Sequence, residues 1–139
     1  MLNQMLVGGL LIVGTVIVHA VSLEWILKAV LAINLEVQIR WRSTVFSFTI
    51  LAVFLAHIIE IWLWALVYHF IEEIPDFETA LYFSTSCFTT VGFGDITLSP
   101  DFRLLSSFEA VNGMILFGWS TAFIFAVVKR TYEHIDVKI

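Results

Sequence analysis

The residues with the clearest chemical potential in this chain of 139 residues form one short segment, 89–95, with the sequence TTVGFGD. Two glycines stand two residues apart, threonines precede them and an acid follows. Long apolar segments lie on both sides. Non-helical backbone near a membrane is tolerated only where it is buried in protein or lines a water-filled path, and its carbonyl oxygens can then replace the hydration shell of a cation. The segment therefore predicts a cation-selective pore, with K+ as the favoured ion.

Each residue type in this segment has an expected part. Carbonyls that point into one axis require a backbone that alternates between conformations most residues resist, and Gly92 and Gly94 adopt positive φ without steric cost. Val91 and Phe93 are expected to turn their side chains into surrounding protein and hold the loop. Thr90 adds a hydroxyl below its own carbonyl. One such loop cannot close a ring, so four chains around an axis are expected, as a homotetramer.

A short helix must position the segment. Asp76 is a good N-cap, and Phe77 to about Phe88 is predicted to be a helix of about 12 residues, which is too short to cross a membrane. Serines and threonines give it a polar side. A short, half-polar helix between two spans fits a re-entrant pore helix. Asp95, at the outer mouth, is expected to attract cations and to bond back to this helix.

Three longer apolar segments are predicted to cross the membrane. The first runs from about residue 5 to 21 and can continue as a helix through 35. The second covers 44–70, where Trp62, Trp64 and Tyr68 are predicted to form an interfacial belt. Ser99-Pro100-Asp101 is typical of a helix start, so the third is predicted over 100–129. The predicted fold is an all-α membrane protein with three transmembrane helices, one re-entrant pore helix and a selectivity-filter loop.

The composition supports a membrane protein and excludes several other classes. Hydrophobic residues make up 60% of the chain and charged residues only 14%, against roughly a quarter charged in soluble proteins, and the mean hydropathy is +0.95. The net charge of −5 offers no basic stripe for nucleic acid. The single cysteine, Cys87, excludes an intrachain disulfide, and no Cys/His spacing is typical of a metal site. No nucleophile–base pair or nucleotide loop can be assembled, so neither an enzyme nor a cofactor other than permeant K+ is expected.

The distribution of charge predicts an orientation in the plasma or bacterial inner membrane. Basic residues flank the 34–43 loop and the C-terminus, whereas residues 72–103 carry six acids and one base. The positive-inside rule then places that loop and the C-terminus in the cytoplasm. The glycine-bearing segment and the N-terminus are expected to lie outside. The two arginines of the loop, Arg40 and Arg42, are topology anchors in this interpretation, because their spacing does not match a voltage-sensing helix.

The sequence TVGFGD at 90–95 resembles the selectivity filter of potassium channels, and the likeness extends over about residues 44–130, as in two-transmembrane-type pore modules. The resemblance implies passive K+ permeation. It implies K+ binding by the backbone of Thr90, Val91, Gly92, Phe93 and Gly94 with the Thr90 hydroxyl, filter support by Tyr82, Phe83, Ser86 and Asp95, a hinge at Gly113 and Gly118, and a cavity lined by Met114, Phe117, Thr121 and Phe125. The implied organisation is an extra N-terminal helix and cytoplasmic linker (1–43), a pore domain (44–130, with outer helix 44–70, pore helix 77–88, filter 90–94 and inner helix 100–129) and a short cytoplasmic tail (131–139).

Three departures from the family pattern leave alternatives open. Phe93 stands where many members have tyrosine, and Ser86 stands where some carry a glutamate paired with the outer aspartate, so Asp95 needs another partner. The segment from residue 5 to about 35 lies outside the two-helix module and has no assigned role. The alternatives to a K+ channel are a weakly selective cation channel and a non-conducting membrane subunit of a larger assembly.

Ionisable residues inside the apolar segments include His19, His57, Glu60 and Glu109. His57 and Glu60 lie three apart on one helix face, which suggests a local hydrogen bond, a partner on another helix or a protonation sensor, and the structural hydrogen bond is favoured. His19 is expected to serve helix packing. Glu109, one turn before Gly113, is expected to bond behind the filter. The sequence identifies no gating stimulus.

Overall fold

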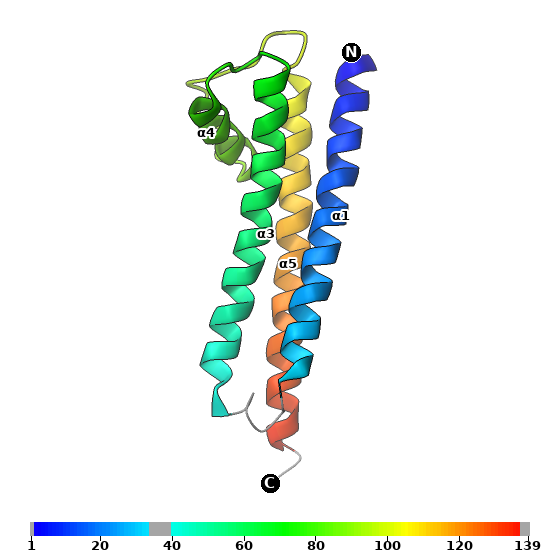
Figure 1. Ribbon diagram of the computed structural model, residues 1–139, viewed down its shortest axis with the longest axis vertical. Helices are drawn as coiled ribbons and strands as arrows, with labels where there is room; N and C mark the ends of the chain where they lie inside the picture. Colours follow the sequence, from blue (N-terminus) through cyan, green and yellow to red (C-terminus); the bar gives the residue numbers. More distant parts are fainter. Residues whose placement is uncertain (1, 34–39, 137–139) are drawn as a thin grey trace.

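The computed structural model describes residues 2–33 and 40–136. It contains the long helices α1 (Leu2–Ala32), α3 (Arg42–Phe70) and α5 (Leu104–Asp136), and the short helix α4 (Phe77–Phe88). The long helices run side by side, and α4 lies near one end of them, packed on α3 and α5 (Figure 1). The described residues include no strand, so the predicted all-α fold is confirmed.

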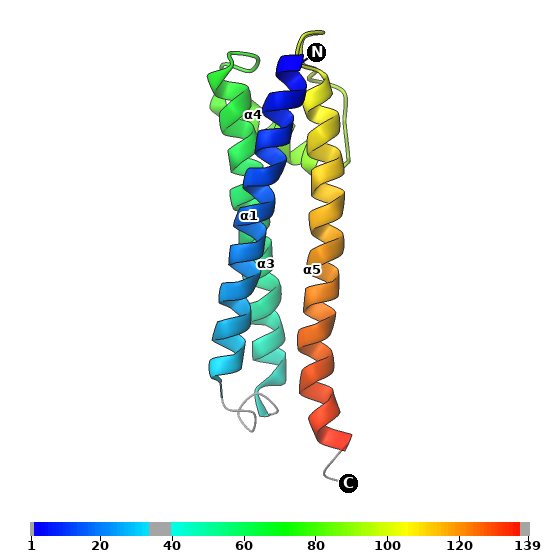
Figure 2. The same cartoon turned by 90° about the vertical axis from the view of Figure 1, so that its right-hand side faces the viewer.

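Three helices are long and apolar enough to cross a membrane, which makes the chain a multi-pass membrane protein. The N-terminal end of α1 lies at the same end of the bundle as α4 and the glycine-bearing loop, and the C-terminal end of α5 lies at the other (Figures 1 and 2). Which end faces the cytoplasm stays a prediction. Most of the loop on which that prediction depends, residues 34–39, lies outside the described residues, as do residues 137–139 of the tail.

The short helix α4 covers the residues predicted for it, and its first turn is capped as expected. The carboxylate of Asp76 accepts a hydrogen bond from the backbone N–H of Thr79 at 2.8 Å. This satisfies one of the N–H groups that a helix start leaves without a partner. The same interaction lowers the pKa of Asp76, with the Thr79 hydroxyl as the largest cause and the Thr79 N–H as the second.

The predicted start of the last helix at Pro100 was wrong. Residues 100–103 form turns and α5 begins at Leu104. Ser99 lies before these turns, where its N–H and hydroxyl both donate to the carboxylate of Glu73, each at 2.8 Å. The side-chain oxygen of Gln4, on α1, accepts a hydrogen bond from the N–H of Leu104 at 3.2 Å. The helix also continues to Asp136, through most of the predicted tail.

The extra helix α1 docks on α3 and α5 along its length. A side chain at Gly8 would meet the Phe108 ring at 2.4 Å, so glycine permits close contact with α5. Further along the same two helices, the buried amide of Asn112 donates to the hydroxyl of Thr15 at 2.7 Å. The continuation of the first apolar segment past residue 21 is confirmed, since α1 ends at Ala32.

Two of the three residues predicted for an interfacial belt on α3 belong to the core instead. Trp64 and Tyr68 are completely buried, whereas Trp62 is 48% exposed. The reason for the error is α4, which covers this end of α3 and removes both side chains from the membrane interface.

Candidate functional site

The loop that follows α4 has an alternating backbone. Thr90, Gly92 and Gly94 have φ of +62°, +55° and +76°, whereas Val91 and Phe93 between them do not enter the positive-φ region. The expected positive φ of both glycines is confirmed. Thr90 adopts the same conformation at a cost of roughly 1–2 kcal/mol for a residue with a side chain. Such a period of two turns successive peptide groups in a common direction.

The N–H groups of this loop point back to one serine of α4. The carbonyl oxygen of Ser86 accepts hydrogen bonds from Val91 N–H at 3.0 Å and Gly92 N–H at 3.1 Å. The hydroxyl of the same residue accepts the N–H of Phe93 at 3.2 Å. Ser86 is itself buried at 8% exposure. One residue of α4 therefore holds three consecutive peptide groups of the loop.

The carbonyl groups of the loop are left free. Among the described residues, no hydrogen bond ends on a carbonyl oxygen of residues 90–94, and these five residues are all exposed in the single chain. Val91 and Phe93 also expose 55% and 66% of their surface, although both side chains were expected to pack into protein. The loop thus presents a row of unpaired acceptors and two uncovered apolar side chains.

The carboxylate of Asp95 is hydrogen-bonded to a residue of α4. The hydroxyl of Tyr82 donates to this carboxylate at 2.9 Å, and the ring of Tyr82 lies parallel to that of Phe93, with centroids 6.1 Å apart. The hydrogen bond to Asp95 raises the pKa of the Tyr82 phenol. Tyr82 therefore contacts the loop twice, by a hydrogen bond to Asp95 and by ring stacking on Phe93. Phe83, which was also predicted to support the filter, is buried in the core, and its ring lies edge-on to that of Tyr68 with centroids 5.2 Å apart.

A comparison with protein families matches residues 56–130 to the family described as "Ion channel", which covers more than half of the chain. The chain belongs to the ion channel family. No match was found among curated proteins or among solved structures. The matched residues include most of α3, all of α4 and the loop, and α5 to Arg130, whereas α1 lies outside them.

Hydrogen bonds centred on Glu109 hold α4 against α3 and α5 of this channel. Glu109, completely buried on α5, lies within hydrogen-bond distance of the Ser84 hydroxyl on α4. It also accepts a hydrogen bond from Tyr68 of α3 at 2.7 Å. The hydroxyl of Ser84 further reaches the carbonyl of Ile61 at 2.8 Å. Glu109 was expected to bond behind the loop, and it does so by joining three helices of the channel.

Gly113 marks the closest approach of α5 to α4. A Cβ atom built there would lie 2.0 Å from the carbonyl oxygen of Phe88, the last residue of α4. Gly118 is different, because nothing lies within 4 Å of its Cβ position. Both glycines were predicted to act as hinges. The contact at Gly113 adds a second reason for glycine, which is to seat the end of α4 directly on the backbone of α5.

The residues predicted to line an inner cavity divide into two groups. Met114, Thr121 and Phe125 are exposed on α5, together with Gly118. Their surfaces are therefore free to face the central axis expected for an assembly of several chains. Phe117 is half-buried and turns into its own chain, where it contacts the ring of His57 at 4.7 Å.

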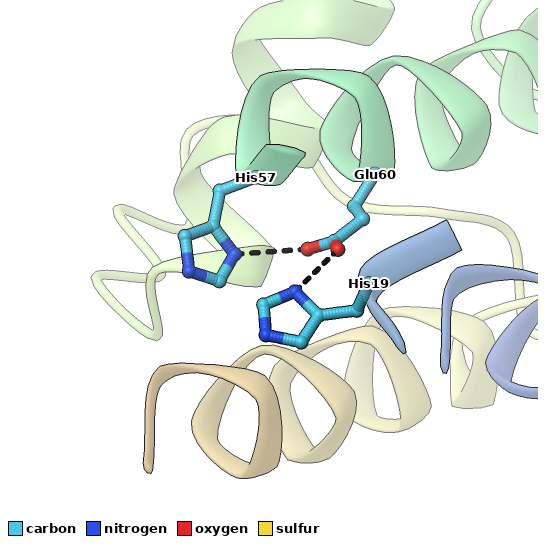
Figure 3. Close-up of side chains that lie close together, drawn as sticks. All are labelled: His19, His57 and Glu60. Carbon is cyan, nitrogen blue, oxygen red and sulfur yellow. Dashed lines mark hydrogen bonds and ion pairs between the residues drawn. The ribbon is translucent and has the colours of Figure 1, made fainter. Parts of the chain in front are cut away.

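Sequence reasoning missed a cluster of buried polar side chains halfway along the long helices, which we call the histidine cluster: His19, His57, Glu60 and Ser120. Figure 3 shows His19 of α1 and His57 of α3 on either side of the Glu60 carboxylate. The expectation of a local hydrogen bond between His57 and Glu60 is confirmed at 2.9 Å, but Glu60 also holds His19 at 2.8 Å. His19 and Glu60 are 41 residues apart, so no local spacing could have revealed the pair.

Proposed function

We propose that this channel is selective for K+ and conducts it passively, down its electrochemical gradient, through a homotetramer in the cell membrane. The observation that carries the proposal is the alternating backbone of residues 90–94, with the N–H groups of residues 91–93 held by Ser86 and with carbonyls that have no partner among the described residues. Rings of such carbonyls can replace the hydration shell of K+. The proposed ligands are the carbonyls of Thr90, Val91, Gly92 and Phe93, with the Thr90 hydroxyl.

The exposed side chains of the loop support the proposed assembly. Val91 and Phe93 leave more than half of their surface uncovered in one chain, at a place where a pore would need rigid walls. Neighbouring copies around an axis would cover these side chains and bring four sets of carbonyls together, as in the four filter loops of K+ channels. We therefore propose that adjacent subunits supply the protein that was expected to surround Val91 and Phe93.

The short helix α4 favours a cation below the loop. It ends at Phe88, immediately before residues 89–95, so the partial negative charge of its C-terminus lies at the inner end of the loop. Four such helix ends would converge on a cation in the proposed cavity. The exposed side chains of Met114, Thr121 and Phe125 on α5 are the proposed lining of that cavity.

The two glycines of α5 have separate parts in this proposal. Gly118 has open space around it and is the place where α5 can bend to open the inner end of the pore. Gly113 rests on the backbone of Phe88, so motion there would carry α4 and the loop with it. The loop and the N-terminus are proposed to face outward, in keeping with the charge distribution of the sequence.

Ion flux into liposomes tests the proposal. The full chain is reconstituted, and uptake of Rb+ or K+ is compared with uptake of Na+. We expect uptake of Rb+ and K+ to exceed that of Na+ by far. Comparable uptake of Rb+ and Na+ would establish a weakly selective channel instead, and no uptake at all would favour a non-conducting subunit.

A pair of glycine variants links the flux to the loop. Gly92→Ala places a side chain at φ +55°, and Gly9→Ala places one on α1, and in both cases nothing lies within 4 Å of the new atom. The two variants therefore differ in backbone strain and not in crowding. We expect Gly92→Ala to lose selective flux and Gly9→Ala to keep it.

A further inference from the structure

The histidine cluster joins three helices through a closed ring of contacts. Glu60 of α3 bonds the Nδ1 atoms of His19 and His57 through its two oxygens, at 2.8 Å and 2.9 Å (Figure 3). On the far side, the hydroxyl of Ser120 on α5 lies 3.2 Å from Nε2 of His19 and 2.9 Å from Nε2 of His57. All four residues are buried, with exposures from 0% to 6%.

We propose that His19, His57 and Glu60 bind a divalent transition-metal ion of the Zn2+ class inside the helix bundle. Two imidazole nitrogens and a carboxylate form a ligand set that Zn2+ accepts. The three ligand atoms lie within 4.8 Å of one another. Donors of one tetrahedral Zn2+ ion stand roughly 3.4 Å apart, given bonds of about 2.0–2.1 Å. Small rotations of the side chains bring the atoms from the observed spacing to that one.

Ser120 is placed as the outer support of such a site. A histidine that ligates a metal usually donates its other ring N–H to a nearby acceptor, which fixes the ring and its tautomer. One Ser120 hydroxyl lies within reach of both Nε2 atoms, and both Nδ1 atoms then point inward to Glu60. A serine oxygen can accept two hydrogen bonds. Both imidazoles can therefore be held in the metal-binding tautomer at once.

Hydrogen-bond accounting leaves room for one cation in the cluster, either an extra proton or a metal ion. Two neutral imidazoles and the serine supply three hydrogens, but the ring of Glu60, His19, Ser120 and His57 contains four contacts. With an ionised carboxylate, one contact would then join two acceptors. An ion bound to both Nδ1 atoms and to the carboxylate removes this deficit, since each Nε2–H can donate to Ser120.

Among the residues that the structure describes, no lysine or arginine forms an ion pair with the Glu60 carboxylate. The cluster is walled by aromatic rings, with Trp119 5.3 Å from His19, and Phe88 and Phe117 6.0 Å and 4.7 Å from His57. Among the described residues, Glu60 makes ion pairs only with the two histidines. A charged side chain inside a membrane is costly without a partner. A divalent ion bound to Glu60 offsets its charge, and water can occupy the remaining coordination position.

The proposed ion gives the extra helix a function. One ligand comes from α1 and two come from α3, so the ion would fasten α1 to the channel module. Because the ligands are closed off by packing, the ion would enter while α1 docks, before the ring closes. It would then act as a structural metal, whose binding energy adds to the stability of the assembled protein.

Metal content after assembly tests the site. The full chain is synthesised in a cell-free system with lipid nanodiscs and Zn2+, freed of unbound ions, and analysed for metal per chain. His19→Gln keeps a donor near Glu60 but removes an imidazole ligand. His69→Gln is the matched control, because His69 lies on α3 outside the cluster and contacts Phe70 and Phe77. We expect about one Zn2+ per chain in the parent and in His69→Gln, and almost none in His19→Gln.

A second probe reports on the ligands and on Ser120. Synthesis with Co2+ in place of Zn2+ should give the visible ligand-field bands of a four-coordinate nitrogen–oxygen site. Ser120→Ala keeps all three ligands and should weaken Zn2+ binding about 10- to 100-fold. If His19→Gln fails to assemble in size-exclusion chromatography, the Co2+ bands of the parent decide. No bound metal in the parent, or as much bound metal in His19→Gln as in the parent, would overturn the proposal and leave a hydrogen-bonded cluster only. Equal binding in the parent and Ser120→Ala would overturn the supporting role of Ser120.

The metal analysis and the flux assay test the two proposals independently. A chain that binds Zn2+ but passes no Rb+ would keep the metal site and refute the proposed function. A chain that conducts selectively without bound metal would do the reverse.

Discussion

The loop of residues 89–95 and the histidine cluster both place polar groups in a membrane protein, and they do so in opposite ways. The loop pairs the N–H groups of residues 91–93 with Ser86, but among the described residues its carbonyls at 90–94 have no partners, and these five residues are exposed. The cluster is buried, and each of its four side chains contacts two others. One region is incomplete in a single chain, whereas the other is closed within it.

The difference separates groups that are proposed to conduct ions from groups that hold the helices together. Unpaired acceptors in a membrane are costly unless an ion or water binds to them, which supports the proposal that ions pass along the exposed carbonyls. Paired polar groups between helices hold the helices in place, and Thr15–Asn112 and Glu109–Tyr68 repeat that pattern. Changes at the loop should therefore alter which ions pass, and changes at buried polar pairs should alter whether the bundle holds together.

The largest effect should come from the contact between the two helices that carry the loop. Gly113→Ala would force a Cβ atom to within 2.0 Å of the Phe88 carbonyl, against rigid backbone at the base of the loop. The cost should exceed the about 1–3 kcal/mol of ordinary overpacking. We expect selective Rb+ flux to fall more than about tenfold, with loss of tetramer, because each 1.36 kcal/mol corresponds to a factor of ten.

Gly118→Ala is the control for that change, on the same helix. Nothing lies within 4 Å of its Cβ position, so the chain should assemble normally. Equal loss of tetramer in both variants would show that helix propensity or flexibility, and not the contact with Phe88, explains the presence of glycine in α5.

The next effect concerns a pair that holds α1. Thr15→Val keeps the shape of the side chain and removes the acceptor for Asn112, whose amide is buried at 1% exposure. A buried donor without a partner costs about 1–3 kcal/mol. We expect a lower melting temperature of the tetramer in detergent, and an unchanged ratio of Rb+ to Na+ flux in the protein that survives.

Ser22→Ala tests whether that loss arises between helices. The Ser22 hydroxyl donates to Val18 of its own helix at 2.7 Å, so its removal should leave the docking of α1 intact. A changed flux ratio in Thr15→Val would contradict the separation of conducting groups from groups that hold the helices together.

A smaller effect should appear at the loop itself. Ser86→Ala removes the hydroxyl that accepts the Phe93 N–H and keeps the carbonyl that holds Val91 and Gly92. The loss is that of one ordinary hydrogen bond, about 1 kcal/mol per chain. We expect the Rb+ to Na+ flux ratio to fall several-fold, with little change in melting temperature. Thr85→Ala is the neighbouring control, because its hydroxyl bonds only to Leu81 of its own helix, and an equal fall there would remove Ser86 from the mechanism.

The sequence allowed the loop to be predicted and not the cluster, because their residues are distributed differently. The loop is a run of consecutive residues, and the positive φ of Gly92 and Gly94 follows from residue type. The cluster joins residues 19, 57, 60 and 120, which only the packing of α1 on α3 and α5 brings together. The start of α5 was misplaced for the same reason. Ser99 bonds to Glu73, and the N–H of Leu104 at the start of the helix donates to Gln4, which is far away in the sequence.

The smallest expected effect concerns the outer end of the loop. Tyr82→Phe removes the hydrogen bond to Asp95 and keeps the ring that stacks on Phe93. Since the side chain is exposed, we expect flux to change no more than about twofold. Reconstituted flux, measured for the parent and the variant side by side, gives this difference.

The pH dependence of that difference identifies the group that holds Asp95. The hydrogen bond raises the pKa of the Tyr82 phenol above its ordinary value of about 10, so the bond is fully present below that pH and is lost only as pH rises through the raised pKa. The ratio of parent to variant flux should therefore stay constant between about pH 6 and pH 9. A ratio that changes within this range would mean that another group, titrating near neutrality, controls the mouth of the loop, and the outer end would then resemble the histidine cluster in having more than one partner for its carboxylate.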